Sequence, residues 1–135
     1  LKKDRDYTVS YSANKGIGTA KVTVTGKGSY TGKITKTFKI NPQGQSISVK
    51  GDKSGKKIAV TLAKHSSNSG YQVSYADNSG FKNSKSLWLS GNSKNKGTIK
   101  GLKSKKTYYV KARDCKNIGK TKVYGKWSAV KKVSI

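Results

Sequence analysis

Apolar and polar residues alternate over short stretches along the whole chain, and this two-residue period predicts β-strands rather than helices. In residues 18–28, Ala20, Val22 and Val24 alternate with Lys and Thr. Similar patterns predict strands over residues 7–12 and 34–40, with only Ile34 expected out of step. Three strands are too few to close a sandwich. We therefore expect the amino-terminal strands of this first domain, residues 1–40, to lie outside this sequence.

The remainder of the chain predicts a second β-domain over residues 46–135. Its expected strands are residues 46–50, 57–64, 71–76, 86–90, 97–102, 107–114 and 127–135. Segments rich in Gly, Ser, Asn and Lys separate them, as turns do. Short strands at this spacing are typical of an immunoglobulin-like β-sandwich, so the predicted fold class is all-β. The segment NPQGQ, residues 41–45, holds the only proline and is interpreted as a short linker.

The charge is strongly one-sided: 30 Lys and Arg against 5 Asp and Glu give a net charge of +25. Such a field attracts polyanions, although lysines spread over strands are also typical of a solvated face that protects sheet edges. Only Arg5 and Arg113 are arginines. Nucleic-acid readers favour arginine, so the composition speaks against a nucleic-acid partner. No apolar run long enough to span a membrane is present.

Catalytic and metal-binding patterns are absent from the sequence. One histidine and one cysteine cannot build a zinc site, and we find no nucleophile pattern around His65. We therefore expect no catalytic, metal or cofactor site. His65 is expected on a loop surface. Cys115 is expected just beyond a strand as an inert thiol, although the neighbouring cations Arg113 and Lys116 favour a lower pKa. None of the five aspartates, Asp114 included, is expected inside a buried strand.

Three segments of the second domain resemble fibronectin type III domains. In GLKSKKTYYVKAR, Leu102 is followed by Tyr108 at the spacing that this family uses at a strand corner. The resemblance implies that the Tyr108 hydroxyl bonds back to the corner backbone. YGKWSAV resembles the last strand of that family and GYQVSYA its third strand. Ile58, Val60 and Leu62 fit the second strand, although Leu62 stands where the family often has Trp.

The first 40 residues resemble a different module. The run GTAKVTVTGKGSYTG resembles the carboxy-terminal part of an immunoglobulin-like repeat found in large surface proteins of Gram-positive gut bacteria. In such proteins these repeats often precede lysine-rich fibronectin-type modules. The resemblance implies an extracellular, cell-wall or secreted location. It also implies that the open edge of the first domain pairs with its own missing part or with another chain.

Exposed aromatic and basic residues are the candidate binding groups. Trp127 is expected to stack on Lys111 or Arg113 of the preceding strand, and Phe81 and Trp88 are expected to form an aromatic spot. The candidate binding residues are Phe81, Trp88, Tyr109, Lys111, Arg113 and Trp127.

The predicted function is non-catalytic display or adhesion, through binding of a host extracellular protein, such as an immunoglobulin or a matrix protein, or of a glycan. Two alternatives remain open. One is electrostatic binding of an anionic cell-wall polymer. The other is an accessory role in a secreted enzyme.

Overall fold

The computed structural model describes residues 1–135 and contains only β-strands, eleven in all. They fall into two compact units, Leu1–Asn41 and Pro42–Ile135. The strands are β1 (Tyr7–Ser12), β2 (Gly18–Gly26), β3 (Lys33–Ile40), β4 (Ile47–Asp52), β5 (Lys57–Leu62), β6 (Gly70–Ala76), β7 (Lys85–Ser90), β8 (Lys96–Ile99), β9 (Thr107–Ile118), β10 (Thr121–Tyr124) and β11 (Lys131–Ser134). No helix is long and apolar enough to cross a membrane.

The first unit is a single antiparallel sheet in the order β1-β2-β3. Val24 of β2 lies opposite Val9 of β1 and Ile34 of β3, so the three apolar side chains share one face. Ile34 is therefore in step with the pattern, and the expectation that it would be out of step was wrong. Thr23 and Thr35 share the other face and join their hydroxyls at 3.1 Å.

The apolar face of this sheet is largely open to solvent. Ile34 is 63% exposed, Phe38 42% and Tyr11 59%. A three-stranded sheet with one such face makes half of a sandwich. The first unit is thus a partial β-sandwich.

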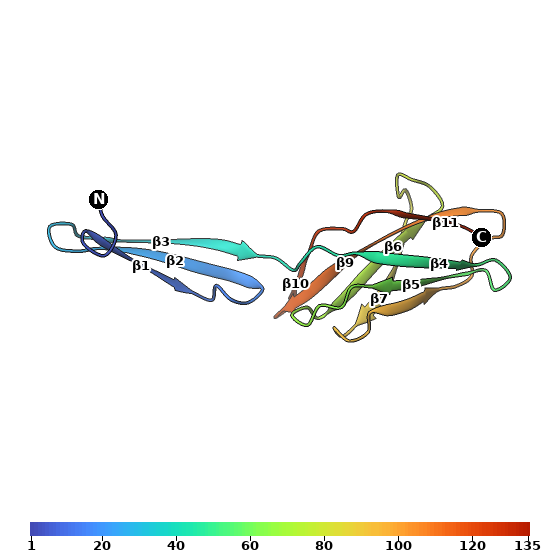
Figure 1. Cartoon of the computed structure of the whole chain (residues 1–135), viewed down its shortest axis with the longest axis horizontal. Coiled ribbons are helices and arrows are strands. Elements are labelled where there is room, and N and C mark those ends of the chain that lie inside the picture. The colour runs from blue at the N-terminus through green and yellow to red at the C-terminus, as the bar shows by residue number, and fades with distance from the viewer. The chain divides into compact units, whose positions relative to one another are not determined.

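The second unit is a two-layer β-sandwich (Figure 1). One sheet has the order β4-β5-β8, and the other has the order β10-β9-β6-β7, with β11 also paired to β9. Inward-facing side chains of both sheets form one core because alternate residues of each strand point to the same side. The buried core residues are Ile47, Ile58, Val60, Leu62, Tyr71, Val73, Ile99, Leu102, Tyr108, Val110, Ala112 and Ile135.

The carboxy-terminal strands differ from the sequence prediction. β9 continues past residue 114 to Ile118 and turns at Gly119, whose φ is +59°, into β10. Residues 117–126, expected as a turn, therefore hold a hairpin. The strand expected over residues 127–135 is confined to β11. Residues 125–130 lie beside β9 but form fewer backbone hydrogen bonds with it than a strand does. In one of these bonds the Ser128 amide donates to the Ala112 carbonyl at 2.7 Å.

The expected linker also differs, because residues 42–45 belong to the second unit. Gln45 is buried and its side-chain amide donates to the Ala63 carbonyl at 3.0 Å. Pro42 and Gln43 lie against Gly125, where an added Cβ would come 2.4 Å from the Gln43 carbonyl oxygen. Only glycine fits at position 125, because the backbone of residues 42–43 packs directly against it. Residues 42–45 are therefore in contact with the sandwich.

The corner before β9 has the bond that the resemblance to fibronectin type III domains implies. The Lys103 amide donates to the Tyr108 hydroxyl at 2.9 Å, and both Tyr108 and Leu102 are buried. The turn between them places Lys105 at φ +58°. The hydroxyl bond therefore fixes a short, locally strained connection.

Replacing Tyr108 by Phe removes this bond and keeps the buried ring. We expect Tyr108→Phe to lower the free energy of unfolding by about 1 kcal/mol, the usual net value of one such bond. Urea denaturation measures the change. Tyr109→Phe is the matched control, since no hydrogen bond of its hydroxyl is present, and an equal loss in both variants would contradict the assignment.

Candidate functional site

Strand β9 places its alternate side chains on opposite sides of the five-stranded sheet. Val110 and Ala112 are fully buried in the core, whereas Lys111 and Arg113 lie on the outer face. Their neighbours on β6 are Ser74 and Gln72. This outer face carries the candidate site.

Arg113 is held between two aromatic rings. Its guanidinium carbon lies 3.6 Å from the Tyr124 ring centroid and 4.3 Å from that of Trp127. Its Nε donates to the Gln72 side-chain oxygen at 2.8 Å. Partial burial lowers the pKa of Arg113 below its usual value, but the value for arginine lies so high that the group stays charged.

Lys111 bridges Trp127 to a loop aromatic. Its Nζ lies 4.7 Å from the Trp127 ring centroid and 4.1 Å from that of Phe81. Phe81 has a φ of +54°, which is unfavourable for an aromatic residue. The loop holds it there through the Asn78 side chain, which accepts from the Lys82 amide and donates to the Lys82 carbonyl, both at 2.9 Å.

A third cation extends the stack in the other direction. The Lys122 Nζ lies 4.2 Å from the Trp88 ring centroid. Trp88 contacts Tyr124 with ring centroids 6.5 Å apart at 46°, and is 44% exposed. Rings at this separation and tilt attract one another.

These contacts form one continuous row, which we call the cation–aromatic ladder. In spatial order its members are Lys122, Trp88, Tyr124, Arg113, Trp127, Lys111 and Phe81. None of its three cations forms an ion pair, because the four ion pairs of the chain involve other residues. The ladder therefore presents uncompensated positive charge on an aromatic surface.

The expected stacking of Trp127 on Lys111 or Arg113 is confirmed, and the ring contacts both cations. Phe81 lies at one end of the ladder and Trp88 next to the other end, so they do not form one aromatic spot. Tyr109 makes no ladder contact. Sequence reasoning missed Tyr124 and Lys122, because both lie in a segment interpreted as a turn. The period-two pattern Lys122-Val123-Tyr124 is the signal that identifies this short strand.

His65 lies on a loop, as expected, but its side chain is only 18% exposed. The placement expected for Asp114 was wrong. Asp114 lies within β9 and is 1% exposed. Its carboxylate accepts from Gln45 Nε2 at 2.6 Å and lies 2.6 Å from His65 Nδ1. A buried carboxylate needs such partners, and His65 is one of them. No group of three or more metal-ligating side chains is present.

The predicted position of Cys115 was wrong, although the expected inert thiol agrees with its burial. It lies inside β9, not beyond its end, and is buried. Burial raises the pKa of the thiol, and this effect outweighs the influence of the nearby cations Lys122 and Arg113. The thiolate is the reactive form, so the folded chain protects this cysteine.

The fold can now be compared with known structures. The chain is similar to a crystal structure of chicken CNTN1 FN1-FN3 domains, with a TM-score of 0.59 and 18% sequence identity over 90% of this chain. It spans 44% of the length of that structure. No protein-family model and no curated protein sequence matches the chain. The likeness shows the fold alone: an all-β protein of antiparallel sheets, similar to fibronectin type III domains.

The ladder predicts a stability difference between its two kinds of cation. Arg113→Lys removes the planar group between two rings and its bond to Gln72, so we expect the free energy of unfolding to fall by about 1–2 kcal/mol. Lys122→Gln, at the exposed end of the ladder, is the control and should cost less than about 1 kcal/mol. Urea denaturation compares the two. Equal losses would show that the sandwiched position has no special role.

Cys115 provides a second test. We expect iodoacetamide to alkylate the native chain at pH 8 at least about tenfold more slowly than the urea-unfolded chain, because burial disfavours the thiolate. Since the folded pKa is the higher one, stability should also fall as pH rises above about 8.5, where the unfolded thiol ionises. Mass spectrometry follows the alkylation. Equal rates in both states would contradict the burial of Cys115.

Proposed function

We propose that this chain is a non-catalytic binding module of an extracellular bacterial surface protein, and that the cation–aromatic ladder contacts a host protein. Fibronectin type III-like folds are commonly binding or scaffold modules. The bacterial and surface context is supported by the sequence resemblance of residues 1–40. The observation that carries the proposal is the ladder itself.

Three properties of the ladder suit a protein interface. Trp, Tyr and Arg are the residues most enriched at interface hot spots, and here they form a contiguous row. The sandwiched Arg113 and Lys111 are held in position, so they lose little conformational freedom when a partner binds. The cations have no carboxylate partners within the chain. An acidic patch on the partner would supply them.

The most exposed aromatic of the ladder is the residue to test. We expect Trp88→Ala to weaken binding to the true partner by about tenfold or more, as loss of an interface anchor does. The purified chain is screened by surface plasmon resonance against immunoglobulins, matrix proteins and mucin, at low and high salt. Binding through the ladder should weaken at high salt but persist, because its aromatic contacts are not screened, whereas its contacts with acidic groups are.

The control variant is Tyr30→Ala, since Tyr30 is an aromatic of similar exposure, 49%, in the first unit. Both variants are checked for an unchanged melting temperature. Equal effects of the two substitutions, or binding that disappears for every partner at high salt, would show that the ladder is not the binding surface.

A further inference from the structure

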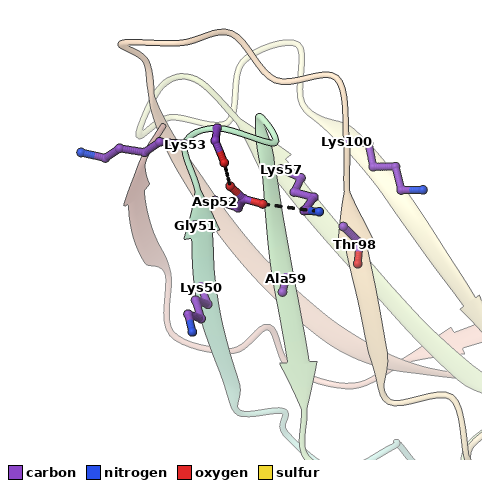
Figure 2. A pocket seen from close by; sticks show the side chains of 9 residues that line it. Lys50, Gly51, Asp52, Lys53, Lys57, Ala59, Thr98 and Lys100 are labelled. Carbon is purple, nitrogen blue, oxygen red and sulfur yellow. Dashed lines mark hydrogen bonds and ion pairs between the residues drawn. The ribbon is translucent and has the colours of Figure 1, made fainter.

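The opposite sheet of the sandwich, β4-β5-β8, carries a trough with a basic rim. It is an open hollow of about 720 Å³. Lys50, Ala59 and Thr98 form one cross-strand row. Figure 2 shows Ala59 on the middle strand, with Lys50 to one side and Thr98 and Lys100 to the other. The trough exists because the short side chains of Ala59 and Thr98 lie between long lysines.

The charge at the rim is positive and largely unpaired. Lys50, Lys53 and Lys100 take part in none of the ion pairs of the chain. The one carboxylate in the trough, Asp52, is engaged locally. It accepts from the Gly55 amide at 2.9 Å and the Ser54 hydroxyl at 2.8 Å, and pairs with Lys57 at 3.4 Å.

These bonds occupy the Asp52 carboxylate, so it does not compete with an external anion for the other lysines of the trough. The Gly55 and Ser54 bonds, together with Lys57, lower the pKa of Asp52. The turn packs closely on the carboxylate, since a Cβ added at position 55 would come 2.5 Å from an Asp52 oxygen and would push that side chain aside. The local turn thus satisfies the only negative charge and leaves three ammonium groups for an external anion.

The lining of the trough also indicates which kind of polyanion fits. Apart from Asp52 it contains only Lys, Ser, Thr, Ala and Gly, with no aromatic side chain and no arginine. Single-stranded nucleic acids bind by stacking bases on aromatic rings, and duplex bases are read mainly by planar side chains such as arginine. Hydroxyl and ammonium groups around a floor of small side chains suit a linear sugar polymer that carries anions at intervals.

We propose that this trough is a binding site for a linear anionic glycopolymer, with Lys50 and Lys100 as principal ligands of its phosphate or carboxylate groups. The site lies on the sheet opposite the cation–aromatic ladder. Occupation of one surface therefore leaves the other free, and the module can contact an anionic polymer and a protein at the same time. This proposal does not depend on the ladder being a protein interface.

The test compares two double variants with the same loss of charge. Lys50→Gln/Lys100→Gln alters the trough, and Lys21→Gln/Lys39→Gln alters two exposed strand lysines of the first unit. The probes are a glucuronate oligosaccharide, a glycerol-phosphate oligomer and hexathymidylate. Titration calorimetry at 50 mM NaCl measures affinity, and backbone amide shifts locate the site.

We expect the trough variant to lose about tenfold or more in affinity for one or both glycopolymer probes, and the control to lose less than about threefold. The probe that is affected identifies carboxylate or phosphate as the anion. The amides of Ala59 and Thr98 should shift, and Trp88→Ala should leave this binding unchanged.

Equal losses in the two double variants would overturn the proposal, because they would show attraction by the overall field alone. Amide shifts spread over both units, or hexathymidylate binding the trough more tightly than both glycopolymer probes, would overturn it as well.

Discussion

The two-residue period of β9 is the constraint on which the rest of the second unit depends. The even-numbered residues from Tyr108 to Asp114 enter the core, and Lys111 and Arg113 stand on the outer face. A slip of one residue would bury two cations and expose the centre of the core. β9 also pairs with β6, β10 and β11. One strand therefore fixes the core, the ladder and the position of both neighbouring segments at once.

Near the end of β9, a buried charged residue, Asp114, lies beside this apolar core. The carboxylate of Asp114 is buried and would be costly without partners. Gln45 and His65 provide them from two separate segments, one before β4 and one after β5. Removing one partner of a buried charge lowers the free energy of unfolding by more than the contact itself contributes, because the charge stays buried without that partner. The bonds at Asp114 therefore make residues 42–45 part of the sandwich rather than a hinge.

Sequence reasoning recovered what is local and missed what depends on distant partners. The strands follow from the alternation of apolar and polar residues, which acts within a few positions. The Tyr108 corner follows from the resemblance to fibronectin type III domains, and the stacking of Trp127 from the expected sandwich, in which the last strand lies beside residues 107–114. The burial of Asp114 could not be predicted, since Gln45 lies 69 positions away and no pattern joins them. The role of Phe81 depends on an unfavourable φ that the Asn78 bonds hold in place. Tyr124 was missed because Gly119 and Gly125 made a short hairpin resemble one long turn.

The two faces of the sandwich use positive charge in different ways. In the ladder, Arg113 is partly desolvated between rings, so its interactions are less screened by salt. In the trough, Lys50 and Lys100 are exposed and their attraction for an anion must weaken as ionic strength rises. The net charge of +25 attracts every anion from a distance, so it does not determine which anion binds to which surface. Specificity must therefore come from what holds each cation: aromatic rings on one sheet, and a floor of small side chains on the other.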